Sequence, residues 1–440
     1  MNSISLWSEA VSQGQNLLKK SKVAGSSPQR KTNLRRAKQA VQDGQFSKAI
    51  AALTSSGLAE PSADIVEELL AKHPQAPPPR LPSDPVPPAT SVSELEVLRS
   101  SKSFPAGSAP GPSGLRPSHL KEAITCPSPD LAGQLLSRLT RLVNFLAAGQ
   151  APSSITPHLC GATLLASRKK NGGHRPIAVG EVLRRLVSKC LATHTRHLAL
   201  TIQSPLQLGV GVKGGCEAIV HAVTQLLSPT LDNNHWTLLL DFSNAFNSIN
   251  REAMFIEFRR KLPGISAWME SCYSQQPRLL LGSNVIKSCC GVQQGDPLGP
   301  LGFALTLQPL LEKIRSEVPS LLLNAWYLDD GTLIGSPECL SSALSIVERE
   351  GPQVGLHLNR SKSLVHSPAD VNPSTSPLPS EIPVTSEGFS LLGCPIGPPS
   401  FCEEILGRRV DDIKEALQVL RSMEDSQLET ALLRSCLAFP

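Results

Sequence analysis

The chain has 440 residues, of which 40% are hydrophobic and 18% charged, and its formal net charge at pH 7 is +5. This length predicts about two or three domains, and the hydrophobic fraction is ordinary for a globular core. No apolar run approaches the ~18 residues of a membrane span, and the N-terminus lacks the charged-then-apolar pattern of a signal peptide. We therefore expect a nuclear or cytoplasmic protein without membrane contact.

The distribution of cysteine and charge narrows the class further. Eleven cysteines are scattered without a Cys-x-x-Cys pair, which predicts free thiols rather than a zinc knuckle or a disulfide framework. Residues 1–60 hold nine Lys and Arg against three acids, and residues 116–213 hold thirteen against three. Such stretches are typical of proteins that grip phosphate backbones, although a solvated helix face explains any single cation equally well.

Residues 1–73 are predicted to form a basic, helical N-terminal region. Lys and Arg crowd its first half, and the apolar run 49–53 ends near Gly57, a helix stop. Nucleic-acid binding, nuclear import and a merely soluble helical pair all fit this pattern. The many prolines of residues 74–90 then predict a semi-rigid extended linker and a domain boundary.

The segment after this boundary predicts helices around a basic hairpin. Ser128-Pro129-Asp130 begins a helix that Gly149 ends. Residues 163–177 read as a strand, a basic Gly-containing turn and a second strand. Cations at such a tip suit a triphosphate, because Arg offers a planar fork for phosphate oxygens and Lys a point charge. Residues 182–191 then predict an amphipathic helix with Arg184 outside its apolar face.

Two apolar segments farther along the chain end in carboxylates. Residues 236–240 predict a buried strand, and Asp241 stands where it ends. Residues 327–331, Tyr-Leu-Asp-Asp-Gly, lie between apolar runs and predict a tight β-hairpin centred on the Asp-Gly dipeptide, with Asp329 and Asp330 at its tip. For an isolated Asp-Asp pair, a solvated turn is the simpler explanation.

A shared site explains both acidic segments at once. If strand 236–240 pairs beside the hairpin, Asp241 and Asp329 converge, and two hard cations bridging their oxygens offset the repulsion. Two such ions ~3.5–4 Å apart activate an attacking oxygen and stabilise a leaving one, which is the chemistry of nucleotidyl transfer. The pattern therefore predicts a polymerase palm.

Three motifs follow one another in this chain. They are Asp-Phe-Ser-Asn-Ala-Phe-Asn-Ser at 241–248, Gly-Val-Gln-Gln-Gly-Asp-Pro-Leu-Gly-Pro at 291–300, and Tyr-Leu-Asp-Asp at 327–330. In this order they resemble the reverse transcriptase family, nearest the kind carried by non-LTR (LINE-like) retroelements. The resemblance covers roughly residues 91–400, because supporting segments lie in family order at 111–115, 175–177, 355–362 and 391–393.

The resemblance implies an α+β fold of the right-hand polymerase type. Fingers and palm, an antiparallel sheet packed on helices, would occupy residues 91–400. The start of a truncated thumb would occupy residues 401–440, with residues 404–438 helical, and the helical N-terminal extension precedes the fingers. Because no ribonuclease H or endonuclease pattern accompanies these segments, we expect one piece of an element-encoded polyprotein.

The resemblance also implies residue roles at the reaction centre. Asp241 and Asp329 would hold two Mg²⁺ ions, or Mn²⁺ in their place, with Asp330 as an auxiliary ligand and Phe242 included in the metal site. Lys362 would protonate the leaving pyrophosphate, and a surface lysine is the equally ranked alternative.

Other implied roles concern the incoming nucleotide. Arg175, with Lys169 or Lys170, would hold its phosphates, although Ala-Ser-Arg at 166–168 departs from the family pattern and leaves the choice of lysine open. Phe246 would stack under the sugar and block a 2′-hydroxyl, so that deoxynucleotides are selected by a clash with the wrong substrate.

The predicted function is RNA-directed DNA synthesis. The partners would be an RNA template, a DNA primer and deoxynucleoside triphosphates; the oligomeric state is not predicted. Gly295 lets backbone pack close to a base pair, and Gln294 is suited to hydrogen-bond template or nucleotide. Two alternatives stay open, namely a catalytically inactive nucleic-acid-binding remnant and an RNA-dependent RNA polymerase. Phe246 argues against the second alternative.

Overall fold

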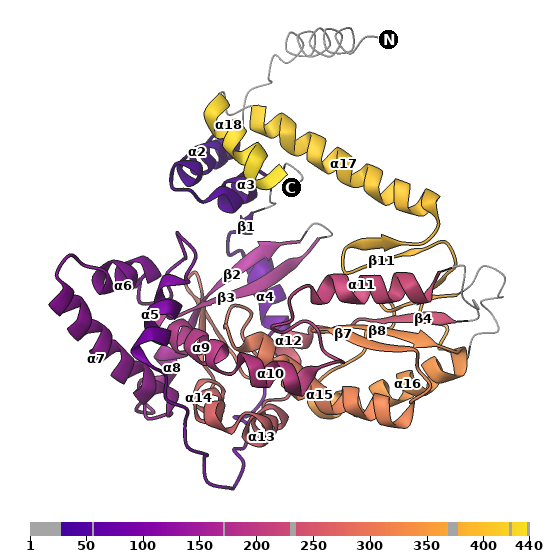
Figure 1. Ribbon diagram of the computed structural model, residues 1–440, viewed down its shortest axis with the longest axis horizontal. Helices are drawn as coiled ribbons and strands as arrows, with labels where there is room; N and C mark the ends of the chain where they lie inside the picture. Colours follow the sequence, from indigo (N-terminus) through magenta and orange to yellow (C-terminus); the bar gives the residue numbers. More distant parts are fainter. Residues whose placement is uncertain are drawn as a thin grey trace. The chain divides into compact units, whose positions relative to one another are not determined.

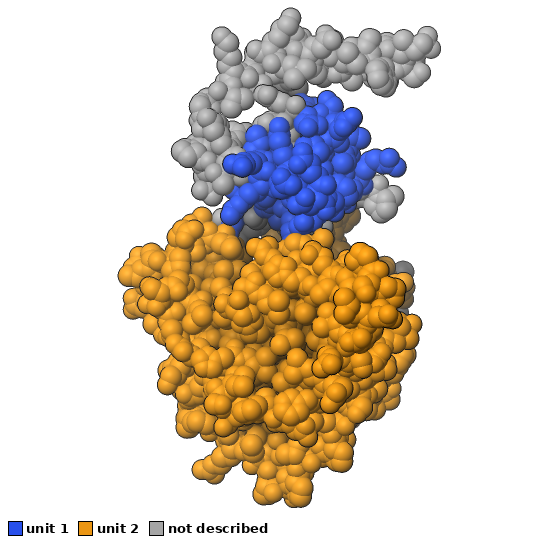
Figure 2. Space-filling view, turned by 90° about the vertical axis from the view of Figure 1, so that its left-hand side faces the viewer, with its two compact units in different colours: residues 1–57, 409–440 blue, residues 58–408 orange. Residues whose placement is uncertain are grey.

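The computed structural model describes residues 28–54, 57–169, 172–228, 235–367, 377–421 and 425–437. The chain divides into two compact units, one made of residues 1–57 with 409–440 and one of residues 58–408 (Figure 2). Helices and antiparallel strands mix within the larger unit (Figure 1), so the predicted α+β class is confirmed. None of the described helices combines the length and the hydropathy that a bilayer crossing requires.

The central sheet of the larger unit, which we call the palm sheet, gathers strands from distant parts of the chain. Its described strands lie in the order β10-β9-β4-β8-β7. Their bounds are β4 (Trp236–Leu240), β7 (Leu323–Tyr327), β8 (Asp330–Gly335), β9 (Leu364–His366) and β10 (Val384–Thr385). Strand β4 pairs antiparallel with β8 on one side and β9 on the other. The apolar run 236–240 is therefore a central strand and almost wholly buried, as predicted.

Side-chain alternation separates the two faces of the palm sheet. Leu333 of β8 packs into the main hydrophobic core of the larger unit, which we call the main core. The next residue, Ile334, packs instead with Ile219 and Val223 of α11 (Gly215–Leu226). Figure 1 shows α11 on one side of the sheet and α15 and α16 on the other. On this side α15 (Gly299–Glu317) and α16 (Pro337–Glu350) contact the sheet, α13 (Arg251–Lys261) packs against α15, and α14 (Pro263–Tyr273) packs against α13.

A second sheet carries the predicted basic hairpin. Strands β2 (Ala162–Arg168) and β3 (His174–Gly180) pair antiparallel along their whole length, so the strand-turn-strand prediction for residues 163–177 is confirmed. Strand β2 also pairs with short β1 (Leu58–Ala59) and with β5 (Arg278–Leu281), which turns into β6 (Asn284–Lys287).

Helices pack beside this second sheet and complete the larger unit. The predicted helix after Ser128 is confirmed as α7, whose N-cap is Ser128 and which is followed by Gly149 in a left-handed conformation. Val143 and Leu146 of α7 lie in the main core. The remaining elements of this unit are α4 (Ala63–Ala71), α5 (Glu94–Lys102), α6 (Pro117–Ile124), α7 (Pro129–Ala147), α8 (Thr156–Leu159), α9 (Val182–His194), α10 (Arg196–Gln203), α12 (Ala245–Ser248), η1 (Gly351–Val354), β11 (Phe389–Leu391) and β12 (Cys394–Ile396).

The proline-rich segment 74–90 lies along α13 and α14. Its backbone accepts hydrogen bonds from Gln276 and Arg259 and donates one to Glu252. Because proline carbonyls accept hydrogen bonds although proline nitrogens cannot donate them, an extended segment can be anchored in this way. The division between the compact units falls near Gly57, ahead of this segment, and places α4 in the larger unit.

The smaller unit joins helices from both ends of the chain. It contains α2 (Pro28–Gln42), α3 (Phe46–Thr54), α18 (Ser426–Leu432), the one-turn π-helix Leu433–Leu437 and the last residues of α17 (Pro399–Arg421). Its core includes Ala37, Val41, Leu420 and Leu432. The predicted single helix over 404–438 is interrupted, because the carboxylate of Asp425 accepts a hydrogen bond from the Leu428 amide and begins a new helix.

Glycine 331 marks a tight backbone contact in the palm sheet. A Cβ atom at Gly331 would lie 2.6 Å from the indole ring of Trp326. We expect Gly331→Ala to lower the free energy of unfolding by about 1–3 kcal/mol, because the buried Trp326 has no room to move. Gly133→Ala, in an open position of α7, should raise it by ~0.5–1 kcal/mol. Thermal unfolding followed by circular dichroism compares the two, and shifts of the same sign would contradict the prediction.

Candidate active site

The hairpin of β7 and β8 carries two of the predicted acids at its tip. Tyr327 pairs with Asp330, so the turn residues are Leu328 and Asp329. The predicted hairpin is confirmed, but its turn, Leu328-Asp329, lies two positions before the expected Asp330-Gly331 centre. The reason is Gln207, which is fully buried and accepts a hydrogen bond from the Leu328 amide at 2.7 Å while donating one to the Leu328 carbonyl at 3.0 Å. These bonds hold Leu328 in a left-handed conformation with φ of 57°.

Asp241 lies beside this tip at the end of β4. Leu240 pairs with Gly331 across the two strands, which places the next residue of β4 against the start of β8. The Asp241 amide donates a hydrogen bond to Ser363, and its carbonyl accepts one from the Asn359 amide at 2.8 Å. Asp241 and the pair at the hairpin tip are therefore brought together as the sequence predicts.

Burial raises the pKa of all three acids, and repulsion by neighbouring carboxylates adds to the rise for Asp329 and Asp330. Partial burial raises the pKa of Asp241, while the nearby charges of Lys362 and Lys169 lower it. Burial and the charge of Asp241 raise the pKa of Asp329. Burial and the charges of Asp329 and Asp241 raise the pKa of Asp330 to about 6. Carboxyl groups shifted in this direction favour a bound cation, because a cation relieves both costs.

The predicted cations surround these acids. The pKa of the Lys169 ammonium is lowered by burial and by the positive charges of Lys72, Arg175 and Lys362. Arg175 in turn acts on Asp329. Lys169, Arg175 and Lys362 thus gather at one place, whereas Lys170 lies outside the described residues. Lys72 was not predicted, because it follows α4 and no local motif marks it.

Two aromatic residues next to Asp241 differ in their surroundings. Phe242 is buried and stacks on Trp326 with ring centroids 6.0 Å apart. Because its hydrocarbon ring has no oxygen, its backbone carbonyl is the group it could offer to a metal ion. Phe246 is half-buried and stacks on Phe303 at 4.6 Å. The Phe246 ring is therefore supported from below by a core residue while part of it stays accessible.

The motif at 291–300 joins the palm to the basic hairpin. The Gln294 carbonyl accepts a hydrogen bond from the Ala178 amide of β3 at 2.8 Å. Gly295 has φ of 135°, and a Cβ atom there would lie 2.2 Å from the Ala178 carbonyl. The close approach that Gly295 permits is therefore to β3. The Gln294 side chain is half-exposed, and its role and that of Gly295 at the template stay predictions.

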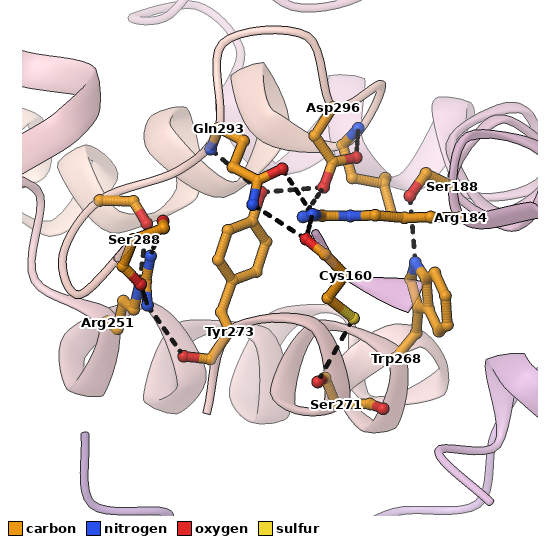
Figure 3. Close-up of polar contacts among 12 residues, drawn as sticks. Cys160, Arg184, Ser188, Arg251, Trp268, Ser271, Tyr273, Ser288, Gln293 and Asp296 are labelled. Atoms are coloured by element: carbon orange, nitrogen blue, oxygen red, sulfur yellow. Dashed lines mark hydrogen bonds and ion pairs between the residues drawn. The ribbon is translucent and has the colours of Figure 1, made fainter. Parts of the chain in front are cut away.

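A buried polar network fixes this motif from behind (Figure 3). Arg184 pairs with Asp296 at 2.7 Å, and each side chain is 1% exposed. Asp296 also accepts a hydrogen bond from the Tyr273 hydroxyl, and Arg184 donates one to Gln293. Arg184, expected outside the apolar face of its helix, is buried against these polar groups, and the sequence did not predict this burial. Nearby, Arg251 donates to the carbonyls of residues 288, 290 and 291.

The carboxylate oxygens of Asp241 and of the two acids at the hairpin tip are suitable ligands for a hard divalent cation. Among the described residues, no group of three or more His, Cys, Asp or Glu side chains forms a ready-made metal cage. Magnesium is commonly held by one or two carboxylates together with substrate phosphates rather than by such a cage. Asp241 and Asp329, with partly desolvated oxygens and raised pKa values, match that arrangement. Their roles as ligands stay predictions.

Acids at the ends of two adjacent interior strands, beside a basic hairpin, form the charge arrangement of a polymerase-type palm. Residues 167–396, more than half of the chain, match the family described as reverse transcriptase (RNA-dependent DNA polymerase). The chain belongs to this family. The predicted resemblance to reverse transcriptases of retrotransposons is confirmed by this match and by the relatives described next.

Two curated relatives are proteins of retrotransposable elements. The SLACS 132 kDa protein of Trypanosoma brucei gambiense is 26% identical over 63% of this chain and 23% of its own length. The Pol polyprotein of the type-2 retrotransposable element R2DM of Drosophila melanogaster is 28% identical over 54% of this chain and 22% of its own length. The matched region of this chain thus corresponds to less than a quarter of either relative.

Solved structures with some likeness include two telomerases. Apo telomerase from Candida tropicalis, truncated from its C-terminal domain, is 12% identical with a TM-score of 0.40, over 60% of this chain and 59% of that one. Telomerase from Candida albicans with a TWJ fragment of telomeric RNA is 11% identical with a TM-score of 0.42, over 64% and 56%.

The raised pKa of Asp330 predicts a pH-dependent stability difference. Because the folded-state pKa is about 6 rather than 3.8, ionisation destabilises the fold as pH rises through this window. Without divalent cations, Asp330→Asn should be more stable than wild type by about 1 kcal/mol at pH 7, a figure reduced for solvent screening. The difference should vanish below about pH 4. Thermal unfolding in EDTA measures it, and equal midpoints at pH 7 would refute the expectation.

The buried Arg184–Asp296 pair predicts strong, non-additive destabilisation. Arg184→Met and Asp296→Leu should each cost about 3–5 kcal/mol, because each leaves an uncompensated buried charge. The double variant should lose less than the sum of the two. Arg185→Met, which removes an exposed contact to the Ala109 carbonyl, is the matched control and should cost less. Denaturant unfolding provides the values, and additive losses would show that the pair is uncoupled.

Proposed function

We propose that this chain is the catalytic domain of an RNA-directed DNA polymerase from a retrotransposable element. It would add deoxynucleotides to the 3′-hydroxyl of a DNA primer along an RNA template. The observation that supports this best is the meeting of Asp241 with Asp329 and Asp330 beside Lys169, Arg175 and Lys362. Acids for metal ions and cations for phosphates are the two charge patterns that nucleotidyl transfer requires.

The acids provide the metal-binding half of the proposed mechanism. Asp241 and Asp329 would hold two divalent ions, with Asp330 assisting and the Phe242 carbonyl available as a further oxygen. When bound, such ions lower the pKa of the primer hydroxyl and neutralise charge on the triphosphate. The Gln207 contacts to Leu328 keep Asp329 in place, so the carboxylates are preorganised for the ions.

The cations provide the nucleotide-binding half. Arg175 presents a planar fork to phosphate oxygens, and Lys169 adds a point charge beside it. Lys362, which lies close enough to act on the charge of Asp241, is the candidate proton donor to the leaving pyrophosphate. The supported ring of Phe246 is the proposed barrier to a 2′-hydroxyl, which favours DNA synthesis over RNA synthesis.

Primer extension tests this function directly. On an RNA template with deoxynucleotides and Mg²⁺ or Mn²⁺, Asp241→Asn and Asp329→Asn should each lose at least ~1,000-fold in rate, because neither asparagine neutralises a bound ion. Asp330→Asn should lose less, as expected of an auxiliary ligand. Asp130→Asn, at an exposed site in the first turn of α7, is the control and should keep wild-type activity. If wild type incorporates no more nucleotide than Asp329→Asn, the proposal fails.

A further inference from the structure

The end of α4 contacts the basic hairpin through a compact set of polar bonds. Oε1 of Glu68 accepts a hydrogen bond from the His174 amide at 2.8 Å, and Oε2 lies 2.5 Å from Nδ1 of the same histidine. Nζ of Lys72 lies 2.5 Å from Oε1 of Glu68 and also donates to the His174 carbonyl. The side chains of Glu68, in α4, and of Lys72, the C-cap of α4, therefore bind the backbone and the ring of His174.

The same end of α4 also contacts the palm. Nδ2 of Asn244 donates a hydrogen bond to the Lys72 carbonyl at 2.8 Å. Asn244 lies three residues after Asp241 and has φ of 52°, a conformation supported by the hydrogen bond from Asn247 to its side chain at 2.7 Å. The Lys72 residue thus connects the hairpin and the loop that follows the first acid.

The contact from α4 lies where the paired strands of the hairpin end and its tip begins. His174 is the first residue of β3 and pairs with Arg168, the last residue of β2, so this pair closes the ladder and the tip that carries Lys169 lies beyond it. Arg175 is its immediate neighbour. Gly172 and Gly173, at the tip, have positive φ values of 86° and 71° and give this turn conformational freedom. A contact at His174 therefore fixes the hairpin at the point where its phosphate-binding cations begin.

The charges around Glu68 also indicate that it helps to hold the hairpin in place. The positive charges of Lys72, Arg175 and Lys362 act on Lys169 and lower its pKa. Glu68 is the carboxylate that contacts this group, through Lys72, from the α4 side. The hydrogen bonds with His174 and Lys72 lower the pKa of Glu68 to about 2, so it stays ionised at any working pH. Glu68 offsets part of the repulsion without contacting the acids that would hold metal.

We propose that Glu68 and Lys72 are positioning residues that clamp the basic hairpin to the palm and so hold Arg175 and Lys169 in place for an incoming triphosphate. This proposal rests on the proposed polymerase function. The clamp acts on nucleotide binding, because it fixes the phosphate-binding cations and leaves the three acids untouched. Its loss therefore raises KM for the nucleotide more than it lowers kcat.

Steady-state kinetics with matched variants test the clamp. Glu68→Gln and Lys72→Met should raise KM for the deoxynucleotide by about tenfold with kcat within about threefold of wild type. Glu67→Gln, an exposed acid one position earlier on α4, makes the same charge change and should leave both constants unchanged. Lys72→Arg keeps a cation that can reach Glu68 and the His174 carbonyl and should retain most of the nucleotide affinity. Unfolding midpoints confirm that each variant is folded.

Hydrogen exchange separates the clamp from the polymerase proposal. Amides of residues 172–180 should exchange faster in Glu68→Gln than in wild type or Glu67→Gln, whether or not the protein is active. If wild type incorporates no nucleotide, the polymerase proposal fails while exchange still decides whether the clamp exists. Equal exchange in Glu68→Gln and Glu67→Gln overturns the clamp. Faster exchange with an unchanged KM shows a contact that does not position the nucleotide site, and this also overturns the proposal.

Discussion

Repulsion among three carboxylates at one end of the palm sheet is the constraint on which the rest of this structure depends. Asp241, Asp329 and Asp330 are partly removed from water beside one another, and each has a raised pKa. Clustered carboxylates of this kind do not stabilise a fold, so other contacts must hold the three acids in place. The surrounding cations and the proposed metal ions are the groups that would offset this repulsion and serve the proposed reaction.

The supports of this site are buried polar contacts between segments far apart in the chain. Gln207 holds the left-handed turn residue before Asp329, and the Arg184–Asp296 pair fixes the loop that meets β3. Each support has little exposure to solvent, so its bonds are strengthened by the low local dielectric and costly to break. The acidic end of the sheet is thus only partly buried and electrostatically strained, while the contacts behind it are buried.

The sequence predicted the parts of the fold and site that depend on local pattern. An apolar run that ends in Asp241, and apolar runs on both sides of an Asp-Gly turn at 327–331, indicated strands whose acids meet, and the structure pairs these strands. The sequence did not predict the place of Lys72 near the site or the burial of Arg184. The Lys72–His174 and Arg184–Asp296 contacts each join residues more than 100 positions apart. An arginine in an amphipathic helix looks the same in the sequence whether water or a buried carboxylate faces it.

The helical unit built from both ends of the chain has a consequence for biosynthesis. Ala37 and Val41 share a core with Leu420 and Leu432, so α2 and α3 cannot complete this core until α17 and α18 are translated. At ~5–20 residues per second this wait is on the order of 20–80 s. During that time α2 and α3 expose hydrophobic surface, and a chaperone that binds short amphipathic helices would find its target there.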